Sequence, residues 1–293
     1  MSVGLAVGCA LASACCFAIS SVLQHRGAAQ APDGSGLHLA LLAHLMARPM
    51  WLLGMLAAIG TLALQVVALA SGPLILVQPL LATGLLFALP VSVLLERCRP
   101  SGVEWSWAAL LVAGLAIFLV AASPGAGPPL PDDKRLVMLA AGAAAIGAIA
   151  AGIGYGPGRN HRATLLGVAT GIAYGLAAAL IKYTVALGRE DVSAVFSTWP
   201  AYALVAVGTA AVLCNQAAYQ AGPLAGPLPA IVIMDSIVAI VASALAFHEE
   251  ISTAALSLAF QVFGFSAMAL AIVALARQSS GRDSRSPTVT NSG

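Results

Sequence analysis

Residues 226–247 read GPLPAIVIMDSIVAIVASALAF, an apolar run that contains a single charged residue, Asp235. A helix of about 20 such residues crosses the hydrocarbon core of a bilayer. The run lacks the alternation of apolar and polar residues that is typical of a membrane β-strand. It therefore predicts a membrane-spanning helix that begins at a Pro-Leu-Pro break and carries an acid near its middle.

Eight more runs of this kind share the chain with it, and together the nine predict an all-α membrane protein. Only 8% of the 293 residues are charged, whereas a soluble domain carries about 25%. This composition excludes a soluble enzyme and a disordered protein, and a net charge of +2 gives no basis for nucleic-acid binding. The nine predicted spans are 3–24, 51–71, 74–95, 105–122, 136–153, 164–187, 200–220, 228–247 and 253–276.

The basic residues predict the orientation of the chain in the membrane. Nine of the thirteen Lys and Arg residues fall on the 1–2, 3–4 and 5–6 loops and on the C-terminal tail. Positive charge is favoured on the cytoplasmic side. We therefore expect a multi-pass protein of the cytoplasmic membrane with its N-terminus outside and its C-terminus inside.

A repeated stretch suggests that the chain has two halves. Residues 65–74, QVVALASGPL, can be laid on residues 215–224, NQAAYQAGPL, and the same offset of 150 places Pro79 on Pro229. Five crossings separate the two copies, so they would have opposite orientations, as in many secondary transporters. The expected units are a first half at 1–122, a linker with the fifth span at 123–162, a second half at 163–276, and a disordered cytoplasmic tail at 277–293.

Glycines at intervals of four predict close helix packing in two spans. Gly4 and Gly8 share a face of the first span, and Gly167, Gly171 and Gly175 share a face of the sixth. Small residues at this spacing let two helix backbones approach closely in lipid.

Asp235 is the main functional candidate. An ionisable group within a span is costly and must face a cavity or a partner, or remain protonated. We expect it to bind a substrate or to couple transport to a proton. The alternative is a neutral acid that hydrogen-bonds to a neighbouring helix.

Amide side chains within the spans are the next candidates. Gln65, Gln78, Asn215 and Gln216 could line a substrate or ion pathway, or bridge helices as structural contacts. Gln65 and Asn215 occupy matching positions in the two copies of the repeat.

Three charged residues lie toward the predicted outer face. Lys182 either extends its ammonium group to the interface or serves as counter-charge to an anionic substrate or to Asp235. Glu249 and Glu250 are expected to be exposed, where they could attract cations to an outer entrance.

The sequence shows no arrangement of residues that is typical of catalysis or of metal binding. Its five cysteines and five histidines lack metal-ligand spacing, and there is no phosphate-binding glycine loop. We expect a protein that is not an enzyme and has no cofactor. Its partners would be a small-molecule substrate or ion and membrane lipid.

Three segments carry a resemblance to a known family. Residues 49–55, PMWLLGM, residues 72–80, GPLILVQPL, and residues 243–249, SALAFHE, resemble the NIPA-like magnesium transporters. These belong to the drug/metabolite transporter superfamily, together with the EamA-like exporters. The resemblance implies an inverted duplication of nine or ten helices and a transport function.

The chain departs from that family at the positions expected to bind the cation. The NIPA-like pattern places an acid and an Asn in the second span, where this chain has Leu62 and Gln65. Divalent cations prefer carboxylate oxygens. We therefore expect a secondary transporter of a small organic metabolite, with magnesium transport as the alternative. A non-transporting membrane partner or flippase subunit is a third reading.

Overall fold

The computed structural model describes residues 3–29, 48–87, 90, 101–125, 127–128, 130–156, 161–221 and 226–283. Within these ranges the chain forms helices and contains no strand. The helices, in chain order, are α1 (Val3–Ala29), α3 (Pro49–Ser71), α4 (Leu74–Leu81), α6 (Gly102–Ala122), α7 (Asp133–Tyr155), α8 (Arg162–Glu190), α9 (Val192–Ser197), α10 (Trp199–Gln220), α11 (Pro227–Leu245) and α12 (Ala255–Asp283).

Eight of the described helices are long and apolar enough to cross a membrane, namely α1, α3, α6, α7, α8, α10, α11 and α12. They correspond to eight of the nine predicted spans. Many of their large apolar side chains, such as Leu56 and Val120, face outward from the bundle. An outer surface of this kind is stable against lipid tails.

The predicted third span, 74–95, differs from the others. The structure describes it only to residue 87 and at residue 90, where the short helix α4 is followed by a turn and by one more helical turn at 84–87. Pro79 lies inside α4 and cannot donate a backbone hydrogen bond, and the chain turns at Ala82 and Thr83. The residues of α4 are nevertheless almost completely buried among the long helices.

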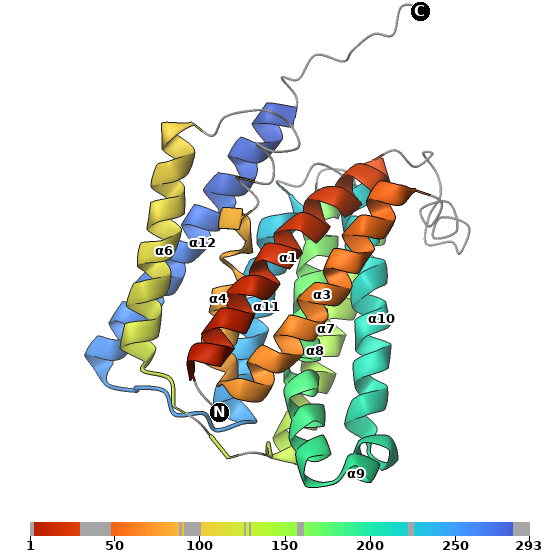
Figure 1. The fold of residues 1–293 in the computed structure, drawn as a ribbon, viewed down its shortest axis with the longest axis vertical. Helices are drawn as coiled ribbons and strands as arrows, with labels where there is room; N and C mark the ends of the chain where they lie inside the picture. The colour runs from red at the N-terminus through yellow and green to blue at the C-terminus, as the bar shows by residue number, and fades with distance from the viewer. Residues whose placement is uncertain are drawn as a thin grey trace, which may run out of the picture.

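The last helix extends further than expected. Helix α12 continues through Asp283, whereas the sequence predicted disorder from residue 277; residues 284–293 lie outside the described ranges. In Figure 1, α1 begins at one end of the bundle and α12 ends at the other. The end at which α1 begins is called the α1 end below.

Several helices start where the sequence provides an N-terminal cap. Ser101 and Glu104 form a reciprocal capping box at α6, and Asp132 accepts a hydrogen bond from the Arg135 amide at α7. Asp191 caps the short helix α9, and its hydrogen bonds from the Ser193 hydroxyl and amide hold the pKa of its carboxyl below the usual value.

Of the two predicted glycine stripes, one lies in a close contact between helices and the other does not. A Cβ atom at Gly167 would lie 2.7 Å from the Pro227 carbonyl oxygen, and one at Gly175 would lie 2.6 Å from the Asp235 carbonyl oxygen. The stripe on α8 therefore packs against α11, as predicted. The prediction for Gly4 and Gly8 is wrong, because a Cβ atom at either position would meet no atom within 4 Å.

Helix pairs make up the bundle. Helix α1 packs along α3, α8 packs along both α10 and α11, and α6 packs along α12. Helix α4 lies against α1 and α11, near the centre of the view in Figure 1.

Candidate functional site

Asp235 lies midway along α11. Two amide side chains from two other helices form a hydrogen-bonded row that ends at its carboxylate. With the Gln78 amide turned so that both of its neighbours are satisfied, its nitrogen lies 3.3 Å from each carboxylate oxygen of Asp235. The Gln78 oxygen then accepts a hydrogen bond of 3.2 Å from Gln65 Nε2. We call Gln65, Gln78 and Asp235 the central cluster, and its members come from α3, α4 and α11.

The central cluster has an acid without a basic partner. Among the residues that the structure describes, no Lys, Arg or His forms an ion pair with Asp235. The Tyr174 ring on α8 packs against Tyr219 and Ile231, and Ile231 lies about one helical turn before Asp235 on α11. The described polar contact of the acid is therefore a neutral amide, an environment in which a carboxyl group can bind a proton or a cation.

Lys182 does not have the partner that the sequence suggested. Its ammonium group forms an ion pair with Glu249, and it lies 5.2 Å from the centre of the Phe247 ring. The prediction that Lys182 faces Asp235 is therefore wrong, whereas its placement at the membrane interface and its role toward an anionic substrate stay predictions. Phe247 is completely buried, so the pair is shielded from water on that side.

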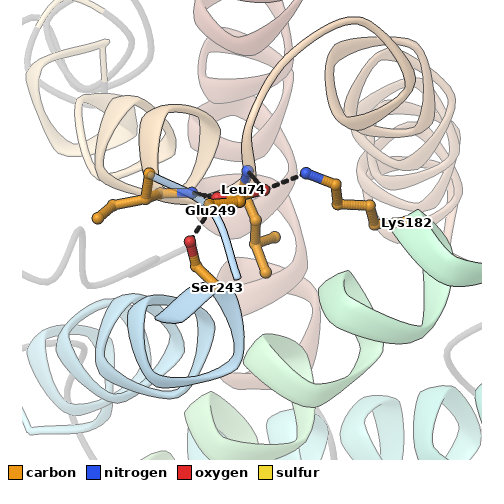
Figure 2. Close-up of polar contacts among 5 residues, drawn as sticks. Leu74, Lys182, Ser243 and Glu249 are labelled. Carbon is orange, nitrogen blue, oxygen red and sulfur yellow. Dashed lines mark hydrogen bonds and ion pairs between the residues drawn. The ribbon is translucent and has the colours of Figure 1, made fainter. Parts of the chain in front are cut away.

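Glu249 is also placed differently from the expectation. Its side chain is only 1% exposed, whereas the sequence predicted an exposed acid at an outer entrance. Besides Lys182 it accepts hydrogen bonds from the Ser243 hydroxyl and from the backbone amides of Leu74, at 2.7 Å, and Ile75, at 3.1 Å. Figure 2 shows these groups converging on the carboxylate from α4, α8 and α11. Glu250, in contrast, is exposed as expected.

Asn215 and Gln216 belong to a separate polar cluster between α1 and α10. Gln216 Nε2 donates to Gln24 Oε1 at 2.7 Å, and Gln24 Nε2 donates in turn to Ser20 Oγ at 2.8 Å. The side-chain oxygens of Asn215 and Gln216 are buried and have no hydrogen-bond partner in the described part of the chain. Each of these two oxygens can therefore accept a hydrogen bond from a further donor group.

The predicted pathway residues therefore occupy three places rather than one. The structure joins Gln65 and Gln78 to Asp235, joins Lys182 to Glu249, and places Asn215 and Gln216 on α10. The sequence analysis missed Gln24, Ser243 and Tyr174. An amide at the end of the first apolar run was a usable signal for Gln24, whereas serines and tyrosines within spans are too common to be singled out.

A divalent cation site is not evident in this arrangement. Within the described ranges, no group of three or more His, Cys, Asp or Glu side chains could hold a metal ion. The central cluster offers one carboxylate and two amides. Such a set has fewer carboxylates than divalent cations usually have in protein sites.

The fold and its apolar helices define the class: the chain is a multi-pass helical membrane protein. It is 34% identical over 237 residues to a protein of Corynebacterium glutamicum described as uncharacterised, and the match covers 80% of this chain and 82% of that protein. The chain belongs to the same family as this corynebacterial protein. No protein-family model matches the chain, and no solved structure matches it.

Proposed function

We propose that the protein is a proton-coupled secondary transporter that moves a small organic metabolite across the cytoplasmic membrane by alternating access. The observation that carries this proposal is Asp235, an acid midway along α11 whose only described hydrogen-bond partner is the neutral amide of Gln78. An acid without a compensating cation can alternate between a bound proton and a bound solute, as a coupling site requires.

The packing of the helices supports a two-halved transporter. Helix α1 packs on α3 as α8 packs on α10, and α1 contacts α4 as α8 contacts α11. In Figure 1 the members of each proposed pair, α1 and α8, α3 and α10, α4 and α11, and α6 and α12, run in opposite directions. This arrangement is expected for an inverted repeat of the drug/metabolite transporter type, with its site between the halves. Residues 222–225, which complete the repeated motif, lie outside the described ranges.

The experiment compares cells that produce the wild-type protein, Asp235→Asn or Glu250→Gln, with expression matched. Metabolites inside the cells and in the medium are measured by mass spectrometry. Solutes that change with the wild type are then added to proteoliposomes that contain a pH-sensitive dye. We expect solute-driven proton flux with the wild type and with Glu250→Gln, in which an exposed acid is changed, and at least a tenfold loss with Asp235→Asn.

Two outcomes would count against the proposal. Normal proton-coupled transport by Asp235→Asn would remove the acid from the mechanism. Wild-type vesicles that take up magnesium, measured with a magnesium-sensitive dye, but move no metabolite and no proton would favour the cation transporter instead. The observed ligand set favours the metabolite, because a single carboxylate suits a proton better than a divalent cation.

A further inference from the structure

The turn after α11 directs Glu249 into the protein. His248 has a φ of 46°, in the left-handed region that a residue with a side chain rarely adopts. The Glu249 amide donates to the Ser243 carbonyl at 3.2 Å, which closes the end of α11. Such a conformation persists only where its surroundings enforce it.

The linker between α6 and α7 supports this turn from the other side. The Gly125 amide donates to the Glu250 carbonyl at 3.0 Å, and the Asp132 amide donates to the Ala246 carbonyl at 2.8 Å. A Cβ atom at Gly127 would collide with the Phe247 carbonyl and would lie 2.9 Å from the Glu249 nitrogen. The linker thus holds the turn in place.

Glu249 supplies the cap that α4 otherwise lacks. The residue before α4 is Pro73, which has no side-chain hydrogen bond to offer, so the first amides of the helix need an acceptor from elsewhere. The carboxylate of Glu249, far along the chain, accepts from both Leu74 and Ile75. Negative charge at a helix N-terminus is also favoured by the helix dipole.

Helix α4 connects this cap to the central cluster. Gln78 lies four residues after Leu74, about one helical turn or 6 Å further along the axis. Its amide is the group that contacts Asp235. A change in the position of the first turn of α4 would therefore move the donor that faces the acid.

We propose that Glu249, paired with Lys182, is a positioning residue that fixes the start of α4 and thereby holds Gln78 against Asp235. This inference rests on the proposed function for the importance of Asp235. Opening the α1 end during transport would separate Glu249 from α4 and release Gln78 from the acid in the same movement.

The experiment uses the full-length protein in lipid nanodiscs and two measurements that need no substrate. Hydrogen exchange reports on the amides of Leu74 and Ile75. Infrared difference spectroscopy, with Asp235→Asn to assign the signal, reports the carboxyl stretching band of Asp235. Glu249→Gln should increase exchange at Leu74 and Ile75 about tenfold, because hydrogen bonds to a charged group are lost. It should also shift the Asp235 band in the same direction as Gln78→Leu does.

The matched control is Glu250→Gln, which changes the neighbouring exposed acid and should alter neither signal. A charge swap, Lys182→Glu with Glu249→Lys, separates capping from simple ion pairing. Lysine has no acceptor for the α4 amides, so the swap should leave their exchange fast. Restored protection in the swapped protein would overturn the capping role.

Two further outcomes distinguish a failure of this inference from a failure of the proposed function. Faster exchange in Glu249→Gln with an unshifted Asp235 band would mean that Glu249 caps α4 without positioning Gln78, and the inference would be wrong. A shifted band together with normal transport by Asp235→Asn would leave the inference standing and overturn the coupling role of Asp235.

Discussion

Glu249 and Asp235 are two acids inside the same helix bundle, and they differ in the number and charge of their hydrogen-bond partners. Glu249 has a cation, a hydroxyl and two backbone amides around it. Asp235 has one amide donor and no basic partner in the described part of the chain. A buried carboxylate is costly unless its charge is compensated.

The difference separates a structural charge from a reactive one. Four donors around Glu249 replace its lost hydration, and removing any of them should be costly. Asp235 is half-buried and lacks that compensation, so exchanging a proton or binding a cation is the way in which its charge can be neutralised. The predictions below test this contrast through stability, in order of decreasing effect.

Lys182→Met should have the largest effect, because it leaves the Glu249 charge buried without its cation. Breaking a buried pair by removing one partner typically costs about 3–5 kcal/mol. We expect a loss of this size in the free energy of unfolding, measured by denaturant titration in mixed micelles. The double variant Lys182→Met with Glu249→Gln should recover part of it, and equal losses in the single and double variants would contradict a coupled pair.

Ser243→Ala should destabilise the protein by about 1.5–3 kcal/mol, the contribution of a hydrogen bond to a charged group. Ser243 is fully buried and donates to Glu249. Ser236→Ala is the control on the same helix, since this buried hydroxyl donates to the Val232 carbonyl. Its loss should be about 1 kcal/mol or less. A similar loss in the two variants would show that the hydrogen bond from Ser243 to Glu249 contributes no more than one to a backbone carbonyl.

Gly175→Ala tests the α8–α11 contact that both acids share. The new Cβ atom would lie 2.6 Å from the Asp235 carbonyl oxygen, and overpacking typically costs about 1–3 kcal/mol. Gly8→Ala adds a methyl group where no atom lies within 4 Å, so it should be neutral or stabilise the helix by up to about 1 kcal/mol. Thermal unfolding of the two variants measures the difference, and an unchanged Gly175→Ala would mean that the two helices are free to separate.

Asp235→Asn should have the smallest effect on stability, within about 0.5 kcal/mol of the wild type, although it should reduce proton-coupled transport at least tenfold. The amide keeps the shape of the acid and removes a charge that no described cation compensates. The same chemical change at Glu249 should destabilise the protein. If Asp235→Asn proved as damaging as Glu249→Gln, the distinction between the two acids would fail.

Much of the fold was predictable because membrane insertion depends on local composition. A continuous apolar run predicts a spanning helix from the residues of one segment, and eight of the nine predicted runs are helices of sufficient length in the structure. The run at 74–95 was harder to interpret. Pro79 and the turn at Ala82 and Thr83 interrupt the helix while the composition stays apolar.

The polar residues were individually visible in the sequence but their partners were not. Asp235, Gln65 and Gln78 were each singled out as polar groups within spans, and the structure brings them together. Lys182 was also noticed, but its partner lies 67 residues away, beyond the three helices α9, α10 and α11. Charge and hydropathy identify a group that needs a partner and contain no information about which helix will supply it.

The sequence by itself determined that this chain forms apolar membrane helices and that one of them carries an acid in its middle, because both properties depend on the residues of a single segment. The tertiary structure alone decided which acid is compensated. Glu249 becomes the cap of α4 because His248 adopts a left-handed conformation, the linker supports that turn, and α8 brings Lys182 to the same point. Each of these contacts joins segments that are distant in sequence, so the partner of a buried charge follows from packing rather than from composition.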